Sequence, residues 1–262
     1  MTTLLADFDV DELTYEGKTK TVFRKGSGPA VVVIAEIPGI TPEVADFARR
    51  LVDAGFTVSM PSLFGTPGTA YSNRLAVKEI SKACVSREFV CMAKGSTSPV
   101  TSWLKALAND LHQECGGPGV GVIGMCLTGG FALAMMTDPV VVAPVLSQPS
   151  LPFALSGAHK RDLGISADDL RLVKERTESG CDVLGLRFTS DKLSPPDRFA
   201  RLRDELGDSF IGVEINSHPG NSYDIASDAH SVVTNDLVDE PGHPTRDALD
   251  QVLGFFSDRL RS

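Results

Sequence analysis

The stretch Val120–Phe131, VGVIGMCLTGGF, decides the fold class of this chain. Its first half is a short apolar run rich in β-branched residues, which is typical of a buried strand. Cys126 follows that run directly, and Gly129 and Gly130 come just after it, where residues without a side chain let a helix begin close to its neighbours. The stretch therefore predicts a buried strand, a sharp turn that carries one thiol, and the first turn of a helix.

The predicted turn has the form of a nucleophile elbow, in which a nucleophile between small residues is exposed at the end of a strand of an α/β-hydrolase sheet. The residue at the nucleophile position is a cysteine. The N-terminus of a helix favours the thiolate, which is the reactive form of this side chain. A structural cysteine in the core is the alternative, since this residue type is often buried. The flanking glycines and the strand–helix junction favour a nucleophile at Cys126.

Strand-like and helical patterns alternate along most of the chain. This alternation predicts the α/β class, with an α/β-hydrolase fold whose mostly parallel central sheet is flanked by helices on both faces. A chain of 262 residues can fold as a single domain over 1–262, and residues 1–24 are expected to add an antiparallel pair at the sheet edge. Strands are expected at 30–35, 57–60, 120–125, 140–146, 183–188 and 210–215, and helices at 42–54, 100–114, 166–179, 195–206 and from 244 onward.

The composition excludes several classes of function. A net charge of −9 without a basic stripe argues against a nucleic-acid partner or an anionic membrane surface. No GxGxxG or Walker sequence indicates a nucleotide site. The scattered cysteines contain no CxxC pair, and the acidic and histidine side chains of 218–230 lack the close spacing of metal ligands. We therefore expect no cofactor and no metal.

The cysteines and the N-terminus also bear on the compartment. Unpaired cysteines are typical of a reducing compartment. The first residues lack the basic region and the long apolar run of a secretory signal. Glycines and prolines interrupt the apolar stretch 119–149, which favours two buried strands around a helix over a membrane span. The sequence therefore predicts a cytoplasmic protein without a membrane partner, and it leaves the oligomeric state open.

Four segments together resemble the dienelactone hydrolase family, a cysteine-nucleophile branch of the α/β-hydrolases. One is the elbow around Cys126, and the others are IAEIPG at 34–39, RFTSDK at 187–192 and AHS at 229–231. The resemblance extends from about residue 31 to residue 260. Nucleophile, acid and histidine follow one another in the order that α/β-hydrolases use.

The resemblance implies a hydrolase that acts on a small carboxylic ester or lactone. Cys126 would attack the carbonyl as a thiolate and form a thioester. His230 would accept the thiol proton and later activate water, and Asp191 would hold the imidazole in one tautomer. Asp191 could instead be an ordinary residue of a strand-end turn. His218, on the same loop, competes for the role of base, whereas His243 is expected at the surface.

The resemblance also places Glu36 near the cysteine, where it would help to govern when the thiol ionises. A glutamate of a surface loop is the alternative. The backbone N–H groups of Leu127 and Ile37 would form the oxyanion hole. Thr128 departs from the pattern, because the elbow usually has glycine two residues after the nucleophile, and its hydroxyl could reach the site.

A second departure concerns the substrate. In dienelactone hydrolases an arginine shortly after the histidine grips the substrate carboxylate, and no arginine stands there in this chain. Arg74 and Arg87 could grip an anionic substrate, although solvated loop arginines are commoner. Both belong to the irregular stretch 62–98, which, like 216–243, would follow a strand end and reach the ligand crevice. The pocket walls are expected mainly from 62–98 and 147–165.

Two other classes of function compete with the hydrolase. The chain could be a non-catalytic protein of the same fold that binds a ligand, because a fold alone does not imply activity. It could also be a redox sensor, since an exposed thiolate oxidises readily, and a resolving cysteine should then lie within disulfide reach of Cys126. The other cysteines lack the context of the elbow and are expected to be structural: Cys84, Cys91, Cys115 and Cys181.

Overall fold

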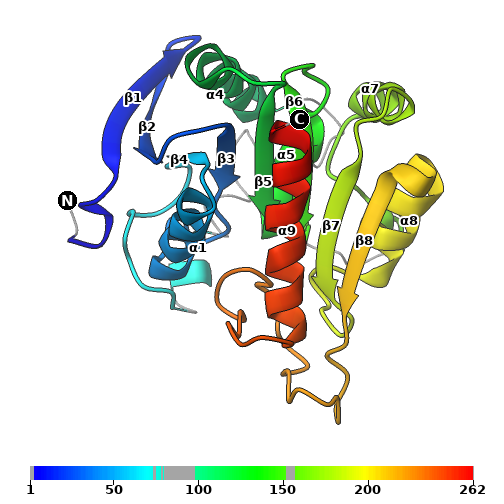
Figure 1. Cartoon of the computed structure of the whole chain (residues 1–262). Helices are drawn as coiled ribbons and strands as arrows, with labels where there is room; N and C mark the ends of the chain where they lie inside the picture. The colour runs from blue at the N-terminus through cyan, green and yellow to red at the C-terminus, as the bar shows by residue number, and fades with distance from the viewer. Residues whose placement is uncertain (1–2, 73–74, 78, 80–97, 152–156, 262) are drawn as a thin grey trace.

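The computed structural model describes residues 3–72, 75–77, 79, 98–151 and 157–261. An eight-stranded sheet forms its centre, with the strand order β1-β2-β4-β3-β5-β6-β7-β8 (Figure 1). The first two pairings in that order are antiparallel, and each later pairing is parallel. The prediction of a mostly parallel sheet preceded by an antiparallel pair is therefore confirmed.

The elements expected from the sequence are present, with ends that differ by at most a few residues. The strands are β1 Asp9–Tyr15, β2 Lys18–Lys25, β3 Ala30–Ile34, β4 Thr57–Pro61, β5 Val120–Met125, β6 Val141–Ser147, β7 Val183–Phe188 and β8 Phe210–Ile215. The described helices are α1 Pro42–Asp53, α4 Pro99–Cys115, α5 Gly129–Met135, α6 Gly157–Arg161, α7 Ala167–Glu178, α8 Pro196–Leu206 and α9 Pro244–Leu260.

Local chemistry sets where two of these helices begin. The hydroxyl of Thr41 accepts a hydrogen bond from Val44 N at the start of α1, and Ser166 accepts one from Asp169 N at the start of α7. Such caps satisfy backbone N–H groups that have no partner within the helix. The helix starts were readable from the sequence for this reason.

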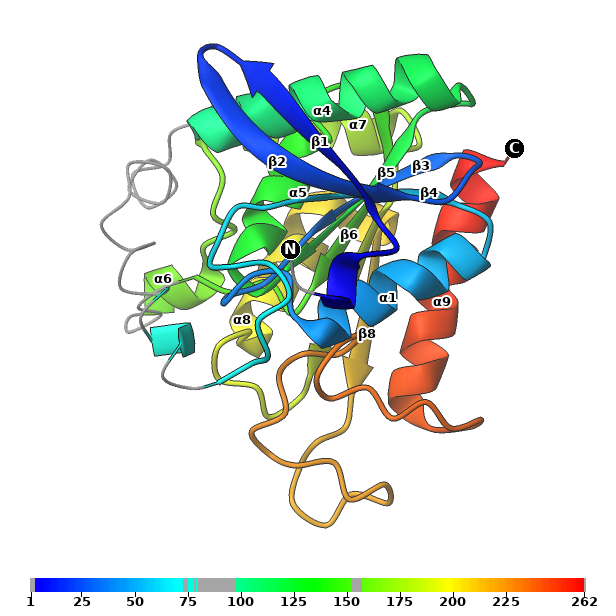
Figure 2. The ribbon, with the colours of Figure 1, turned by 90° about the vertical axis from the view of Figure 1, so that its left-hand side faces the viewer.

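Helices cover both faces of the sheet. α1 and α9 lie on one face, and α4, α5, α7 and α8 lie on the other (Figures 1 and 2). The core is correspondingly divided into two apolar clusters, one under each set of helices. Every residue of β3 and β5 is buried, as expected for parallel strands that are covered on both sides.

Gly124 allows the chain to turn back on itself directly after β5. A Cβ atom at this position would stand 2.2 Å from the carbonyl oxygen of Thr128 and 2.9 Å from the Ala132 side chain. No side chain fits in that space, so the close return of the chain requires glycine.

The carboxyl ends of the parallel strands lie at one edge of the sheet, where open α/β folds bind their ligands. Glu36 follows β3, Cys126 follows β5, and Asp191 follows β7. The segment 216–243, which follows β8, contains no helix or strand and carries His230. The fold thus delivers four side chains from separate parts of the sequence to the same edge. Within the described ranges, none of the helices has the length and apolar character needed to cross a bilayer.

Candidate active site

The turn after β5 is a strained elbow with Cys126 at its tip. Cys126 has a φ of +54°, in the left-handed region that residues with a side chain seldom adopt. It is half-buried, begins the short 3-10 turn Cys126–Thr128, and is followed by α5. Such a conformation costs about 1 to 3 kcal/mol and is found preferentially at functional sites. The elbow predicted from the sequence is present.

Thr128 closes this elbow and does not reach the cavity with its hydroxyl. The buried Oγ1 accepts a hydrogen bond from Met125 N (2.7 Å). Its own proton can go to the carbonyl oxygen of Ile34 or of Met125, each 2.8 Å away. The suggestion that this hydroxyl could reach the site is therefore wrong, because backbone groups at the ends of β3 and β5 use its hydrogen-bonding capacity.

We expect Thr128→Val to destabilise the protein by about 1 to 3 kcal/mol, because Met125 N would be left buried without its acceptor. Thr128→Ser retains the hydroxyl and is the matched control. Urea unfolding followed by circular dichroism measures both variants. Equal stability of the valine and serine variants would contradict this role.

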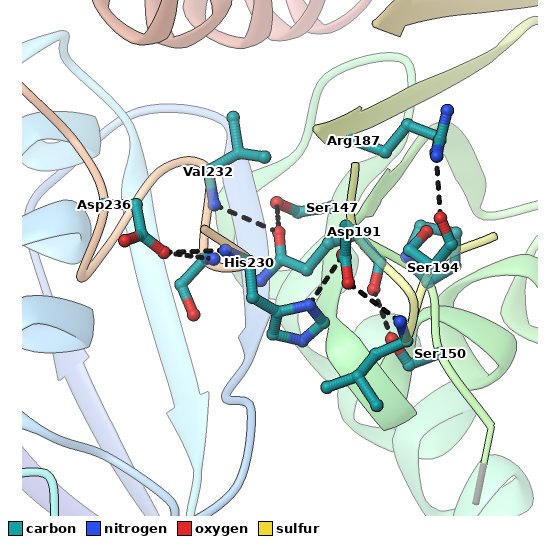
Figure 3. Close-up of polar contacts among 12 residues, drawn as sticks. Ser147, Ser150, Arg187, Asp191, Ser194, His230, Val232 and Asp236 are labelled. Carbon is teal, nitrogen blue, oxygen red and sulfur yellow. Dashed lines mark hydrogen bonds and ion pairs between the residues drawn. The ribbon is translucent and has the colours of Figure 1, made fainter. Parts of the chain in front are cut away.

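His230 and Asp191 form a close pair. His230 Nδ1 lies 2.7 Å from Asp191 Oδ2, and the other carboxylate oxygen of Asp191 accepts a hydrogen bond from Leu193 N at 2.8 Å (Figure 3). Asp191 is buried, and its two oxygens are thereby fixed. An aspartate held in this way fixes the ring orientation of its histidine and the position of its Nδ1 proton.

The second ring nitrogen of His230, Nε2, is available to exchange a proton. Nε2 is buried and makes no well-formed hydrogen bond with a described residue. Burial lowers the pKa of His230, but the charge of Cys126, the hydrogen bond to Asp191, the closeness of the Cys126 thiol to the ring and the charge of Asp191 together outweigh this effect. The pKa of His230 is therefore raised well above its ordinary value, which favours an imidazolium beside the thiol.

A carboxylate that the sequence analysis missed holds the loop of His230. Asp236 Oδ2 accepts hydrogen bonds from His230 N and Ser231 N, both at 2.8 Å (Figure 3). Aspartate commonly binds backbone N–H groups in irregular segments. The segment has several acidic residues, however, and nothing in their spacing indicates which of them turns inward.

Arg187 holds the turn that carries Asp191, and it was missed as well. Its side chain is 1% exposed. It donates to the carbonyl oxygen of Ser194 at 2.8 Å (Figure 3). It also donates to the carbonyl oxygen of Thr189 at 3.0 Å, on the other side of Asp191, and it forms an ion pair with Glu214 on β8. The aspartate is therefore positioned by its own turn and by the neighbouring strand.

Glu36 is buried, at 3% exposed, so the alternative of a surface glutamate is wrong. Ser231 Oγ donates to its Oε2 at 2.7 Å, and Thr234 Oγ1 donates to its Oε1 at 2.5 Å. Gln148 Nε2 donates to Oε2 at 3.2 Å. Two of these donors come from the stretch after His230 that lacks the arginine. Neutral donors thus stabilise this carboxylate, since a buried charge requires hydrogen bonds or a counter-charge.

Gln148 links Glu36 to the histidine loop. Its side chain is fully buried, and its backbone has a φ of +37°. The amide carbonyl accepts hydrogen bonds from Val232 N (3.4 Å) and from the hydroxyl of Ser147. Its role depends on contacts between distant segments, so nothing in the local sequence could indicate it.

A cavity of about 490 Å³ lies at the elbow. It brings together five of the predicted residues: Glu36, Ile37, Cys126, Leu127 and His230. Asp191 stands behind His230 and does not line the cavity. Tyr71, Ala76, Leu151 and Leu193 make much of the remaining wall apolar, and Ser150, Asp228, Ser231, Asn235 and Asp236 complete it.

Both segments predicted to form the cavity walls do so, but a third segment contributes as well. Tyr71 and Ala76 come from 62–98, and Ser150 and Leu151 come from 147–165, as expected. Segment 216–243 contributes wall residues as well as the histidine. Arg74 and Arg87, the candidates for gripping an anionic substrate, lie outside the described residues, as do Cys84 and Cys91.

The competing side chains lie elsewhere. His218 Nδ1 is 3.0 Å from Ser190 Oγ on the exposed surface, and His218 does not line the cavity. The expectation that His243 lies at the surface is wrong. It is buried, its Nδ1 accepts a hydrogen bond from Thr245 N at the start of α9, and the Tyr223 ring packs edge-on against it.

The remaining cysteines and acids form no second site in the described part of the chain. The described cysteines are free thiols, with Cys181 buried and Cys115 half-buried. Burial raises the pKa of the Cys181 thiol, as expected for a structural cysteine. No cluster of histidine, cysteine and acidic side chains among the described residues is arranged to hold a metal ion.

The family model that matches this sequence is that of the dienelactone hydrolase family, and it covers residues 18–259. The chain belongs to the dienelactone hydrolase family. As a member of this family it is a hydrolase, and the family membership supports activity on esters. No curated protein matches the sequence significantly.

Solved structures show the same α/β-hydrolase fold as this family member. A dienelactone hydrolase from Anabaena variabilis has a TM-score of 0.63 at 15% identity, and the match covers 97% of this chain and 98% of that one. A dienelactone hydrolase-like promiscuous phosphotriesterase from metagenomic libraries has a TM-score of 0.61 at 17% identity, over 97% and 98%. A cold-adapted esterase from an Arctic intertidal metagenomic library has a TM-score of 0.57 at 15% identity, over 96% and 92%. The predicted fold class is confirmed.

Proposed function

We propose that this dienelactone hydrolase family member is a thiol-dependent hydrolase of a small carboxylic ester or lactone, with Cys126 as its nucleophile. The observation that carries the proposal is the arrangement of His230. Asp191 binds its Nδ1 at 2.7 Å, Nε2 is left over, and Cys126 raises its pKa from the other side. Nucleophile, base and orienting acid in this relation are the constellation of nucleophilic acyl transfer.

In the first half-reaction, the Cys126 thiolate attacks the carbonyl carbon and the carbonyl oxygen becomes an oxyanion. The backbone N–H groups of Leu127 and Ile37, which both line the cavity, would stabilise that charge. The carbon–oxygen bond then breaks, the alkoxide takes the proton of the His230 imidazolium, and a thioester remains on Cys126. With a lactone, the new hydroxyl stays attached to the acyl group.

In the second half-reaction, His230 accepts a proton from water, and the resulting hydroxide attacks the thioester. The intermediate collapses, the carbon–sulfur bond breaks, and the free acid leaves. Cys126 and His230 return to the thiolate–imidazolium pair. Asp191 stabilises the imidazolium in both halves.

Glu36 is proposed to act on the resting thiol. It lines the same cavity as Cys126, and its hydrogen bonds to Ser231, Thr234 and Gln148 fix it there. A buried negative charge near a thiol opposes a second negative charge. Glu36 would therefore help to govern when the thiol ionises.

Further aspects of the function remain proposals. The protein is expected to act as one domain over 1–262 in the cytoplasm, without cofactor, metal or nucleic acid. Arg74 and Arg87 remain candidates for gripping an anionic substrate. The free state of the described thiols gives no support to the redox-sensing alternative, and the buried histidine–aspartate pair favours catalysis over simple ligand binding.

The proposal predicts a covalent intermediate. We expect that acid quenching of the protein within the first turnovers of p-nitrophenyl acetate traps an acetyl group on the peptide that contains Cys126. Peptide mass spectrometry locates the group, and the Cys115 and Cys181 peptides of the same digest are internal controls. An acetyl group found on another residue, with Cys126 unmodified during turnover, would overturn the assignment of the nucleophile.

A further inference from the structure

Arg198, in α8, is a buried cation that binds backbone carbonyl groups. Its side chain is 2% exposed. Nε donates to Asp162 O (2.6 Å), Nη1 donates to Pro149 O (2.8 Å) and Leu193 O (3.3 Å), and Nη2 donates to His159 O (3.2 Å). Backbone groups of residues 149, 159–162 and 193 therefore meet at one guanidinium group.

Such a group is costly to bury, because a cation in the interior loses its hydration. Burial lowers the pKa of Arg198 to about 10, against the charges of Asp162, Cys126 and Asp191, which raise it. The side chain is thus still a cation at neutral pH, and each carbonyl oxygen receives a charge-assisted hydrogen bond. A neutral side chain at this position could not give these carbonyl oxygens charge-assisted hydrogen bonds, which explains why a cation is buried here.

Two of the carbonyl groups that Arg198 binds lie at a wall of the cavity: Leu193 lines it, and Pro149 directly precedes the lining residues Ser150 and Leu151. Ser150 N donates to the carbonyl oxygen of Cys126 at 2.9 Å, and Ser150 Oγ donates to Gln148 O at 3.0 Å. Pro149 packs against the first residue of α5, because a Cβ on Gly129 would stand 2.8 Å from the Pro149 side chain. The segment 149–151 is therefore held between the elbow on one side and Arg198 on the other.

We propose that Arg198 is a positioning residue for substrate selection. It fixes one wall of the cavity, formed by Ser150, Leu151 and Leu193, and that wall determines which apolar group fits beside Cys126. The inference deepens the proposed hydrolase and rests on it. Two of the three wall residues are leucines, so the group selected is an alkyl or aryl group.

Arg176, in α7, provides a matched control. It also donates to backbone carbonyl groups: Nε to Met136 O (3.2 Å), and Nη2 to Pro139 O (3.3 Å) and Val141 O (2.8 Å). These acceptors precede or begin β6, at the edge of the sheet opposite the elbow. Arg176→Lys and Arg198→Lys therefore remove the same kind of interaction, and both keep the positive charge.

The test compares the two variants with the wild type in a series of N-alkylmaleimides, from methyl to hexyl. The rate of alkylation at Cys126, located by peptide mapping, reports the fit of each chain without requiring hydrolysis. We expect Arg198→Lys to change the ratio of the hexyl rate to the methyl rate by roughly tenfold, the scale of a methylene or two in an apolar pocket. Arg176→Lys should keep the wild-type ratio.

The same proteins are assayed with p-nitrophenyl esters from acetate to octanoate. Arg198→Lys should shift the KM values of the long esters more than kcat. An unchanged ratio in Arg198→Lys, or an equal change in both lysine variants, would overturn the proposal. Should Arg198→Lys fail to fold, Leu193→Ala changes the same wall at a residue that is 56% exposed. An unchanged ratio of the hexyl to the methyl rate in that variant would overturn the proposal too.

Absence of ester turnover in every protein, with a normal maleimide series, would instead point to failure of the proposed hydrolase.

Discussion

Replacing Cys126 by serine should lower kcat for an activated aryl ester by about 10³-fold or more, a scale seen when a nucleophile of a catalytic constellation is lost. The loss has two causes: the sulfur atom itself and its partner His230. Thiols as a class are far more acidic than aliphatic hydroxyls. The raised pKa of His230 favours an imidazolium, which can pair with a thiolate but gains no such partner from a neutral serine hydroxyl. Steady-state hydrolysis of p-nitrophenyl esters and of simple lactones measures the loss.

Cys115→Ser is the matched control for this experiment. Cys115 ends α4, is half-buried, and does not line the cavity, so the same exchange there should leave turnover near that of the wild type. Turnover close to wild type in Cys126→Ser would contradict the thiolate mechanism. An equal loss in both variants would show that the loss is not specific to the elbow.

Replacing Asp191 by asparagine should lower kcat by up to about 10⁴-fold, the effect of the equivalent change in a serine protease triad, while KM changes little. The asparagine occupies the same space but carries no charge. It can also present its amide N–H to His230 Nδ1, which favours the wrong tautomer. Full kinetics with one ester separates kcat from KM, and a pure rise in KM would contradict the orienting role.

The pH profile gives the same substitution a second readout. Asp191 raises the pKa of His230, so its loss should lower that pKa and move the alkaline limb of kcat/KM to lower pH. The raised pKa of His230 also stabilises the folded protein. This stabilisation is complete below the pKa of histidine in the unfolded chain, and it is lost as the pH rises through the raised pKa of the folded state. Asp208→Asn removes the same charge from an exposed turn before β8 and should leave the limb in place.

Much of the fold could be predicted because local sequence determines it. Strand β5 has no charged residue, the caps Thr41 and Ser166 mark helix starts, and alternation of strands and helices requires a mostly parallel sheet. The elbow was also predictable, since Gly124 and Cys126 stand at a strand end followed by a helix. These features depend on neighbours in sequence.

The candidate site was predictable where it carries reactive groups. Glu36, Cys126 and His230 line one cavity, and Asp191 contacts His230, although the four are far apart in the sequence. A resemblance in motif order was sufficient for that placement.

The supporting residues were not predictable. Gln148 and Arg198 bind backbone groups of distant segments. Arg187 and Asp236 bind backbone groups of their own turn and loop, where other polar residues could have done so. His243 shows the same limit, because the surface position expected for a histidine beside a helix start depends on how its own loop folds, and here the Tyr223 ring packs against it.

The order of the strands has a consequence for biosynthesis. β5, with the thiol, pairs with β3 and β6, which both precede β7 and β8 in the sequence, so the elbow can form before the last two strands leave the ribosome. The segment that carries His230 comes after β8 and is joined to the rest by Asp191, Glu36 and Gln148. A nascent chain therefore holds its cysteine without the histidine proposed to activate it, and the two can meet only when the last part of the sheet is complete.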